Sequence, residues 1–158
     1  MQFQDGSING VIWKPLKKFH DGRGWLCELF RHDDTPGEFH PVMAYISLTE
    51  VGVARGPHEH VDQADYFCFI GPSNFKIYLW DNRRQSSTFG HRDTRVAGID
   101  EPMALLVPSG IVHAYKNVGQ EPGLVFNCPN RLYKGSGRKD PVDEIRHEDR
   151  TDSVYKLD

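Results

Sequence analysis

Gly52-Val-Ala-Arg-Gly-Pro-His-Glu-His60 is the stretch around which the rest of this chain is organised. It places an arginine, two glycines and a His-x-His pair in close succession. Successive side chains of an extended strand point to opposite faces, so His58 and His60 would project together while Glu59 points away. Two imidazoles on one face can bind a metal ion or transfer protons. Surface histidines without a function would show the same local pattern, so the interpretation depends on the surrounding sequence.

The apolar segments around this stretch are short, rich in Val, Ile, Phe, Tyr and Trp, and separated by Gly, Pro, Asn and Asp. Such spacing is typical of strands and turns, and helical periodicity is almost absent, which predicts an all-β sandwich or barrel. We expect strands at 11–13, 16–19, 25–31, 42–48, 66–70, 75–80, 104–107, 111–116 and 123–126. Segments 66–70 and 75–80 are expected to form a hairpin. The charged segment 141–150 is expected to form one short helix or to lie on the surface.

Length, charge and cysteine content limit the class of protein. A chain of 158 residues suits one domain, 1–158, with a core at about 8–134 and a short charged C-terminal extension at 135–158. The net charge of −3, with acidic and basic residues interspersed, disfavours nucleic acid and anionic membranes as partners. Cys27, Cys68 and Cys128 each lie in an apolar run, which is the pattern of buried thiols in a reducing cytosol. No signal peptide or long apolar run is evident, so we expect a soluble cytoplasmic protein.

A second cluster, Pro108-Ser-Gly-Ile-Val-His-Ala-Tyr-Lys-Asn117, follows about fifty residues after the first. Together the two clusters resemble the signature motifs of the cupin superfamily, with Asp65 as the acid of the first motif. The resemblance implies a jelly-roll barrel, also called a double-stranded β-helix, with His58, His60, Asp65 and His113 converging at its mouth. Three imidazoles and a carboxylate suit a divalent transition metal. A barrel that keeps these side chains without a metal is the alternative.

A narrower resemblance covers about 120 residues. Five motifs occur in the order found in dTDP-4-dehydrorhamnose 3,5-epimerases, namely Asp21-Gly-Arg-Gly24 with Glu28 and Phe30, then Gly52 to His58, Asp81 to Gly90, Val107 to Tyr115 and Asp140-Pro141. The chain is identified as a divergent member of that family. The resemblance implies a homodimeric, metal-independent isomerase that acts in deoxysugar-nucleotide and polysaccharide biosynthesis.

The resemblance also implies roles for individual residues. A 4-keto sugar has acidified C–H bonds at C3 and C5, so epimerisation needs a base, a donor for the enolate oxygen and an acid. His58 matches the base of the family. Arg23 and Arg55 match positions that face the nucleotide diphosphate, where a guanidinium can bind two phosphate oxygens. Glu28 would bind the nucleotide or orient one of these arginines.

The chain departs from the family at the positions of the enolate donor and the acid. The lysine that steadies the enolate falls at Ala64 or Asp65. The tyrosine acid falls at Asn127, which cannot donate that proton but could bind substrate. We expect Tyr115 or Tyr133 to replace it as a catalytic residue.

Two further positions differ. His60 stands where the family has an amide, which keeps it among the substrate-binding candidates. The C-terminal aspartate that supports the base has only Asp158 or Asp152 as a counterpart.

Three functions remain open. The first is an isomerase that removes a proton from a nucleotide-linked 4-keto-6-deoxyhexose through His58 and requires no cofactor. The second is a metal-dependent cupin enzyme, in which the ion polarises a carbonyl or activates water or oxygen. The third is a non-catalytic cupin that binds sugar nucleotides. A metal-bound His58 could not also act as a free base, so the first two functions conflict at this residue.

Overall fold

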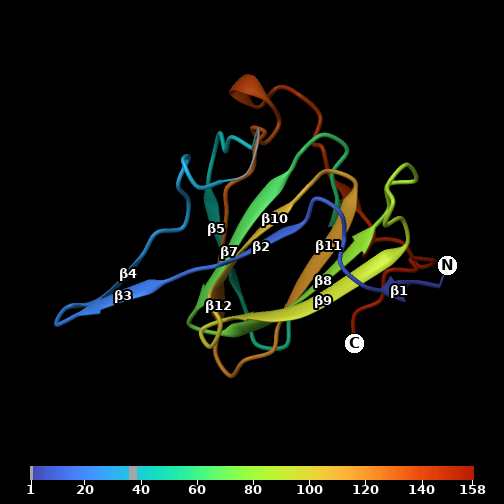
Figure 1. Ribbon diagram of the computed structural model, residues 1–158. Coiled ribbons are helices and arrows are strands. Elements are labelled where there is room, and N and C mark those ends of the chain that lie inside the picture. The colour runs from blue at the N-terminus through green and yellow to red at the C-terminus, as the bar shows by residue number, and fades with distance from the viewer. Residues whose placement is uncertain (1, 36–38) are drawn as a thin grey trace.

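The computed structural model describes residues 2–35 and 39–158, which form two facing β-sheets (Figure 1). The first sheet has the spatial order β1 (Gln4–Asp5), β9 (His91–Gly98), β8 (Asn74–Asp81), β11 (Ile111–Asn117), β6 (Ala54–Glu59) and β13 (Ile145–Arg146). The second has the order β2 (Ile12–Pro15), β10 (Met103–Val107), β7 (Asp65–Gly71), β12 (Gly123–Asn127) and β5 (Tyr45–Thr49). The predicted all-β jelly roll is confirmed.

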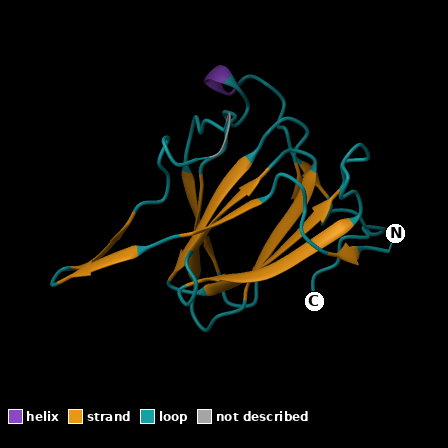
Figure 2. Ribbon diagram, in the orientation of Figure 1, coloured by secondary structure: helices purple, strands orange, loops and turns teal. Residues whose placement is uncertain are grey.

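Two smaller elements complete the described part of the chain. Strands β3 (Lys18–Asp21) and β4 (Gly24–Cys27) form a two-stranded ribbon that projects away from the barrel (Figure 1). A single 3₁₀ turn, η1 (Ser136–Arg138), is the only helical element among the described residues (Figure 2). None of these residues belongs to a helix of the length and apolarity needed to cross a bilayer.

Alternation along the strands places the core between the sheets. Phe75, Ile77 and Leu79 of β8 are buried in this core together with residues of β7, β10, β11 and β12. Tyr78 and Trp80 belong instead to a cluster on the outer face of the first sheet, together with segments near the two termini. The outer face of the second sheet is covered by the segment between β2 and β5, which contributes Leu16, Leu29 and Phe30. Strands with both faces buried, such as β7 and β10, are therefore apolar along most of their length, which explains why their runs lack a simple period of two.

The predicted hairpin between residues 66–70 and 75–80 is wrong. Strand β7 pairs with β10 and β12 in the second sheet, whereas β8 pairs with β9 and β11 in the first. The connection through Gly71 therefore crosses from one sheet to the other. The sequence analysis also missed β9, because its charged residues alternate with few apolar ones. The strand predicted at 25–31 ends already at Cys27.

The charged C-terminal segment folds back over the barrel instead of forming a helix at 141–150. Within it, β13 pairs with β6 and thereby extends the first sheet. Tyr155 packs edge-on against Trp80, with ring centroids 5.6 Å apart. This segment consequently forms part of the structure around the first histidine motif.

The cysteine prediction is correct only in part. All three thiols are free, but Cys68 alone is buried, while Cys27 and Cys128 are half-buried. Burial raises the pKa of each thiol, so none of the three is a reactive thiolate at neutral pH.

Candidate active site

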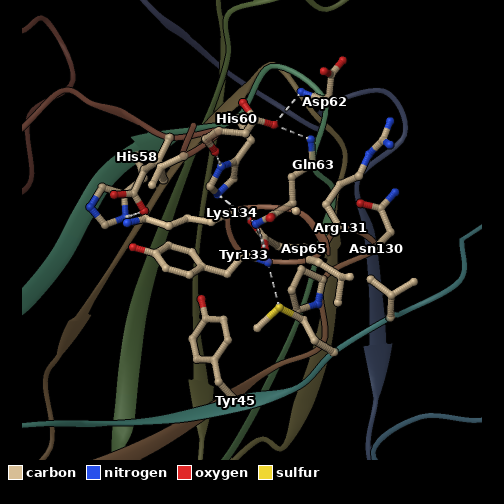
Figure 3. Close-up of a pocket in the computed structure, with 18 of the residues that line it drawn as sticks. Tyr45, His58, His60, Asp62, Gln63, Asp65, Asn130, Arg131, Tyr133 and Lys134 are labelled. Carbon is tan, nitrogen blue, oxygen red and sulfur yellow. Dashed lines mark hydrogen bonds and ion pairs between the residues drawn. The ribbon is translucent and has the colours of Figure 1, made fainter. Parts of the chain in front are cut away.

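A pocket of about 1060 Å³ opens between the two sheets at the end of the barrel covered by the C-terminal segment (Figure 3). Most of the sequence-predicted site residues line this pocket: Arg55, His58, His60, Asp65, His113, Tyr115 and Tyr133. Side chains from strands far apart in the sequence therefore meet at one place, as the cupin resemblance implies.

Gly56 brings the first histidine motif close to the second. His58 pairs directly with His113 across β6 and β11, and the register shifts just beyond this pair. Gly56 has a φ of +86°, and a Cβ atom built there would lie 2.6 Å from the carbonyl oxygen of His113. Only glycine fits this backbone, because other residues rarely adopt positive φ and no side chain has room. The glycine of the Gly-Pro-His sequence is thus required because β6 and β11 approach closely at this position.

His58 is held by a carboxylate of the C-terminal segment. Its Nε2 lies 2.6 Å from Oε1 of Glu148, and its Nδ1 lies 4.0 Å from Oε2 of Glu144. The prediction that Asp158 or Asp152 supports this histidine is wrong. Asp158 instead pairs with Lys76 at 2.7 Å. Glu148 lies in a charged segment without apolar periodicity, so no pattern in the sequence indicates its position.

His60, Asp65 and His113 form a buried cluster in the pocket floor. The Nε2 atoms of His60 and His113 lie 3.2 and 3.6 Å from Oδ2 of Asp65. Burial lowers the pKa of His60, but the neighbouring Asp65 and Asp143 outweigh it and raise this pKa to about 9. Burial dominates at His113 and lowers its pKa to about 4, although Asp65 acts in the opposite direction. At neutral pH His60 is therefore cationic and His113 neutral.

Burial also acts on Asp65, whose pKa it tends to raise. The two imidazoles of the cluster and Asn127 overcome this effect and hold the pKa below its usual value. Asp65 is consequently a carboxylate that neutralises the charge of His60.

Asp143 fastens the C-terminal segment across the pocket mouth. Its carboxylate accepts hydrogen bonds of 2.8 to 2.9 Å from the backbone N–H groups of Val61, Asp62 and Gln63. Its backbone carbonyl accepts a hydrogen bond from Nδ1 of His60. The loop after β6 is thereby tied to the segment that carries Glu148.

Asn127 lies beneath the pocket and is buried, so it does not make the predicted contact with substrate. Its Oδ1 accepts a hydrogen bond from the backbone N–H of Tyr66 at 3.1 Å. Its Nδ2 donates to Oδ1 of Asp65 at 2.8 Å and to the hydroxyl oxygen of Tyr45 at 2.9 Å. The tyrosine that Asn127 contacts lines the pocket, and the sequence analysis missed it because only strand pairing brings the two together.

The three predicted nucleotide contacts lie in two different places. Arg55 lines the pocket, where its Nε donates to Oγ1 of Thr49 and its Nη2 to the carbonyl of Leu48. Arg23 and Glu28 lie on and just after the projecting ribbon, outside this pocket. Four cations that the sequence analysis did not select line the pocket instead, and these are Arg131, Lys134, Arg138 and Arg146.

Comparison with known proteins agrees with this geometry. Residues 5–151 match the family model of dTDP-4-dehydrorhamnose 3,5-epimerase. The chain is 38% identical over 129 residues to the probable low-salt glycan biosynthesis epimerase Agl13 of Haloferax volcanii, covering 80% of this chain and 81% of the relative. It is 37% identical over 126 residues to the spore coat polysaccharide biosynthesis protein SpsL of Bacillus subtilis, covering 80% and 82%.

Solved structures share the same barrel. A dTDP sugar isomerase from Desulfovibrio desulfuricans superposes with a TM-score of 0.76 at 20% identity, covering 88% of this chain and 84% of the other. ChmJ, a 3'-monoepimerase from Streptomyces bikiniensis in complex with dTDP-quinovose, superposes with a TM-score of 0.74 at 21% identity, covering 99% and 82%. Family match, fold and site together define a carbohydrate epimerase of the cupin type. The chain belongs to the dTDP-4-dehydrorhamnose 3,5-epimerase family.

Proposed function

We propose that the protein epimerises a nucleotide-linked 4-keto-6-deoxyhexose, with His58 as the base. The observation that carries this proposal is the bond between His58 and Glu148 in a pocket large enough for a sugar nucleotide. A carboxylate only accepts hydrogen bonds, so Nε2 of His58 carries the proton and Nδ1 keeps its lone pair. Nδ1 is therefore the atom that takes the proton next to the C4 carbonyl.

Proton removal leaves an enolate on the sugar and an imidazolium at His58. Glu148 stabilises the imidazolium as it forms. Since Asp65 stands near the place of the family's lysine, the positive charge for the enolate comes from His60, which is cationic at neutral pH. No cofactor takes part in these steps.

The nucleotide diphosphate binds among the cations of the pocket. Arg55 is held by its Nε and Nη2 bonds, and its Nη1, which bonds none of the described residues, can bind phosphate. Arg131 and Lys134 line the same pocket from the segment that follows β12. The Streptomyces monoepimerase was solved with dTDP-quinovose, which supports a dTDP-linked sugar for this chain too. The free cysteines fit a reducing cytoplasm, where we place the reaction.

We also propose a homodimer in which the projecting ribbon completes the site of a second copy. The ribbon exposes apolar side chains, with Trp25 48% and Leu26 62% accessible. The side chain of Arg23 at its tip is 91% accessible. Exposed apolar surface of this kind marks an interaction site. A second copy would cover it and would receive Arg23 and Glu28 at its own pocket.

A metal-dependent reaction is the second candidate, and the buried cluster favours it. The ligand atoms of His60, Asp65 and His113 lie within 4.8 Å of one another. Nδ1 of each histidine bonds a backbone carbonyl, which turns both Nε2 atoms toward Asp65. This donor set fits a transition metal with three protein ligands. His58 is not part of the group, so the predicted set of four ligands reduces to three, and metal binding no longer conflicts with a free base.

Deuterium exchange tests the proposal directly. The protein is incubated in D₂O with dTDP-4-keto-6-deoxyglucose, and deuterium at C3 and C5 is followed by NMR. We expect exchange in the wild type and none in His58→Asn, with the fold retained because the pocket wall tolerates this change. Absence of exchange with any dTDP-4-keto-hexose in the metal-free wild type, despite dTDP-sugar binding, would leave only the non-catalytic binder.

Metal analysis separates the two candidate reactions. The main proposal expects full exchange after dialysis against a chelator. A stoichiometric metal that is lost in His60→Ala, together with loss of exchange, would establish the second candidate instead.

A further inference from the structure

Epimerisation requires groups on both faces of the sugar ring. A proton leaves one face of the carbon, and another must return from the opposite face to invert it. His58 reaches the pocket from β6 in the first sheet. The acid therefore has to come from the second sheet or from a loop on that side.

Tyr45 meets this requirement from β5, the edge strand of the second sheet. Figure 3 shows its ring rising from that strand into the pocket. Tyr45 is also the direct cross-strand partner of Asn127 in the pairing of β5 with β12. A phenol that faces the pocket thus stands beside the position from which the family's tyrosine is missing.

The bond between these partners defines the direction of the Tyr45 hydroxyl. The backbone N–H of Tyr66 fixes Oδ1 of Asn127, so the amide turns its two N–H bonds to Asp65 and Tyr45. The hydroxyl oxygen of Tyr45 accepts this bond and keeps its own proton for donation. Within residues 2–35 and 39–158, no side chain or carbonyl accepts that proton. The proton is therefore available to a molecule in the pocket.

We propose that Tyr45 is the catalytic acid, which returns a proton to the sugar carbon opposite His58 while Asn127 holds its oxygen. This inference rests on the proposed epimerase function. His58 takes a proton from the carbon, and the C–H electrons pass into the enolate. The enolate then takes the hydroxyl proton of Tyr45 at the opposite face and regenerates the ketone. The tyrosinate that remains accepts the N–H of Asn127, and solvent carries a proton from the imidazolium back to it.

The two tyrosines expected from the sequence are less suited to this step. Tyr115 is on β11, in the same sheet as His58, and its ring packs among Phe67, Phe69 and Phe75. Its hydroxyl bonds Oγ of Ser47 at 3.0 Å. Tyr133 lines the pocket from the loop after β12 and is exposed to a similar extent as Tyr45. It has no amide partner comparable to Asn127 among the described residues, so Tyr133→Phe tests the competing assignment.

The test separates proton removal from inversion. Wild type and variants are incubated in D₂O with dTDP-4-keto-6-deoxyglucose, and NMR follows deuterium in the recovered substrate and in the inverted product. Tyr45→Phe should keep deuterium exchange into the substrate, because His58 still removes and returns the proton on its own face. Its inverted product should fall at least about a hundredfold, the usual contribution of a positioned acid. Tyr78→Phe removes the hydroxyl of a tyrosine on the outer face of the first sheet and is the control, which should form the product within about threefold of wild type.

A second substitution guards against a merely structural effect. Tyr45→His places another proton donor at the same position and should recover part of the inverted product. Inversion at the wild-type rate in Tyr45→Phe, or its loss in Tyr133→Phe or Tyr115→Phe alone, would overturn the assignment. These results leave the proposed function intact, because it fails only when wild type and Tyr45→Phe both lack exchange.

Discussion

Nε2 of His58 lies 2.6 Å from Oε1 of Glu148, a residue 90 positions further along the chain. In the proposed mechanism this pair sets the tautomer of the base and stabilises the imidazolium. Glu148→Gln keeps the shape of the side chain but removes its charge. We expect kcat for deuterium exchange to fall about ten- to a hundredfold, a large part of the contribution of a general base.

Glu144→Gln is the control, because Glu144 lies 4.0 Å from Nδ1 of His58 and pairs with Arg146 at 2.6 Å. Its kcat should remain within about threefold of wild type. Equal losses in the two variants would show that the general negative charge of the segment matters and not the bond to His58.

The proposed exchange of ribbons predicts complementation between inactive subunits. Arg23→Ala and His58→Asn should each lose activity as pure proteins. Unfolding and refolding them as an equal mixture makes half of the dimers mixed, and each mixed dimer has one site with both native residues. Activity should then return to about a quarter of wild type, as expected for a twofold symmetric dimer. If the refolded mixture is as inactive as the two pure proteins, the ribbons are not exchanged between subunits.

The raised pKa of His60 predicts how stability depends on pH. Its pKa in the folded state, about 9, lies above the ordinary value of about 6.5 because Asp65 and Asp143 outweigh burial. The protonated ring therefore stabilises the fold fully below about pH 6.5, and this contribution is lost as the pH rises through 9. Urea unfolding between pH 6 and 9.5 should show the advantage of wild type over His60→Gln shrinking by about 2–3 kcal/mol.

Gln120→Ala, an exposed substitution without a titratable group in the turn between β11 and β12, is the control for this measurement. Its difference from wild type should stay constant with pH. A constant difference for His60→Gln as well would mean that His60 is not charged in the folded protein.

The close contact at Gly56 predicts that a substitution there destabilises the fold more than the same substitution at another glycine with positive φ. Gly56→Ala would place Cβ 2.6 Å from the carbonyl of His113, so we expect a loss of about 2–4 kcal/mol in the free energy of unfolding. Gly52 has a φ of +75°, but a Cβ there would meet no atom within 4 Å. Gly52→Ala should therefore cost only about 1 kcal/mol of backbone strain. Denaturant titration of both variants measures their free energies of unfolding, and the difference between the two losses is the cost of the Cβ contact beyond backbone strain.

The sequence predicted the barrel well because its signals are local. Short apolar runs and turn residues indicate strands, and the two histidine motifs carry enough fixed positions to identify the family. The order of strands within the sheets was not predictable in this way. The turn after β7 has the composition of a hairpin, yet it crosses between sheets because each strand finds its partners elsewhere.

The residues of the candidate site likewise fall into those that the sequence indicated and those that only the structure revealed. His58, His60, His113 and Arg55 were found from the sequence because their motifs are contiguous. Glu148 was missed because a charged segment without periodicity gives no indication of where it folds. Tyr45 was missed because only the pairing of β5 with β12 places it beside Asn127.

The sequence by itself determined the fold class and the family of this protein, since both depend on residues that are neighbours in the chain. Tertiary structure alone decided which carboxylate holds His58, which imidazole carries a charge, and which tyrosine of the pocket bonds Asn127. These properties depend on distances and burial across the barrel. Hydrogen bonds and pKa values follow from what lies within a few ångströms, and strand pairing brings together residues that the sequence separates.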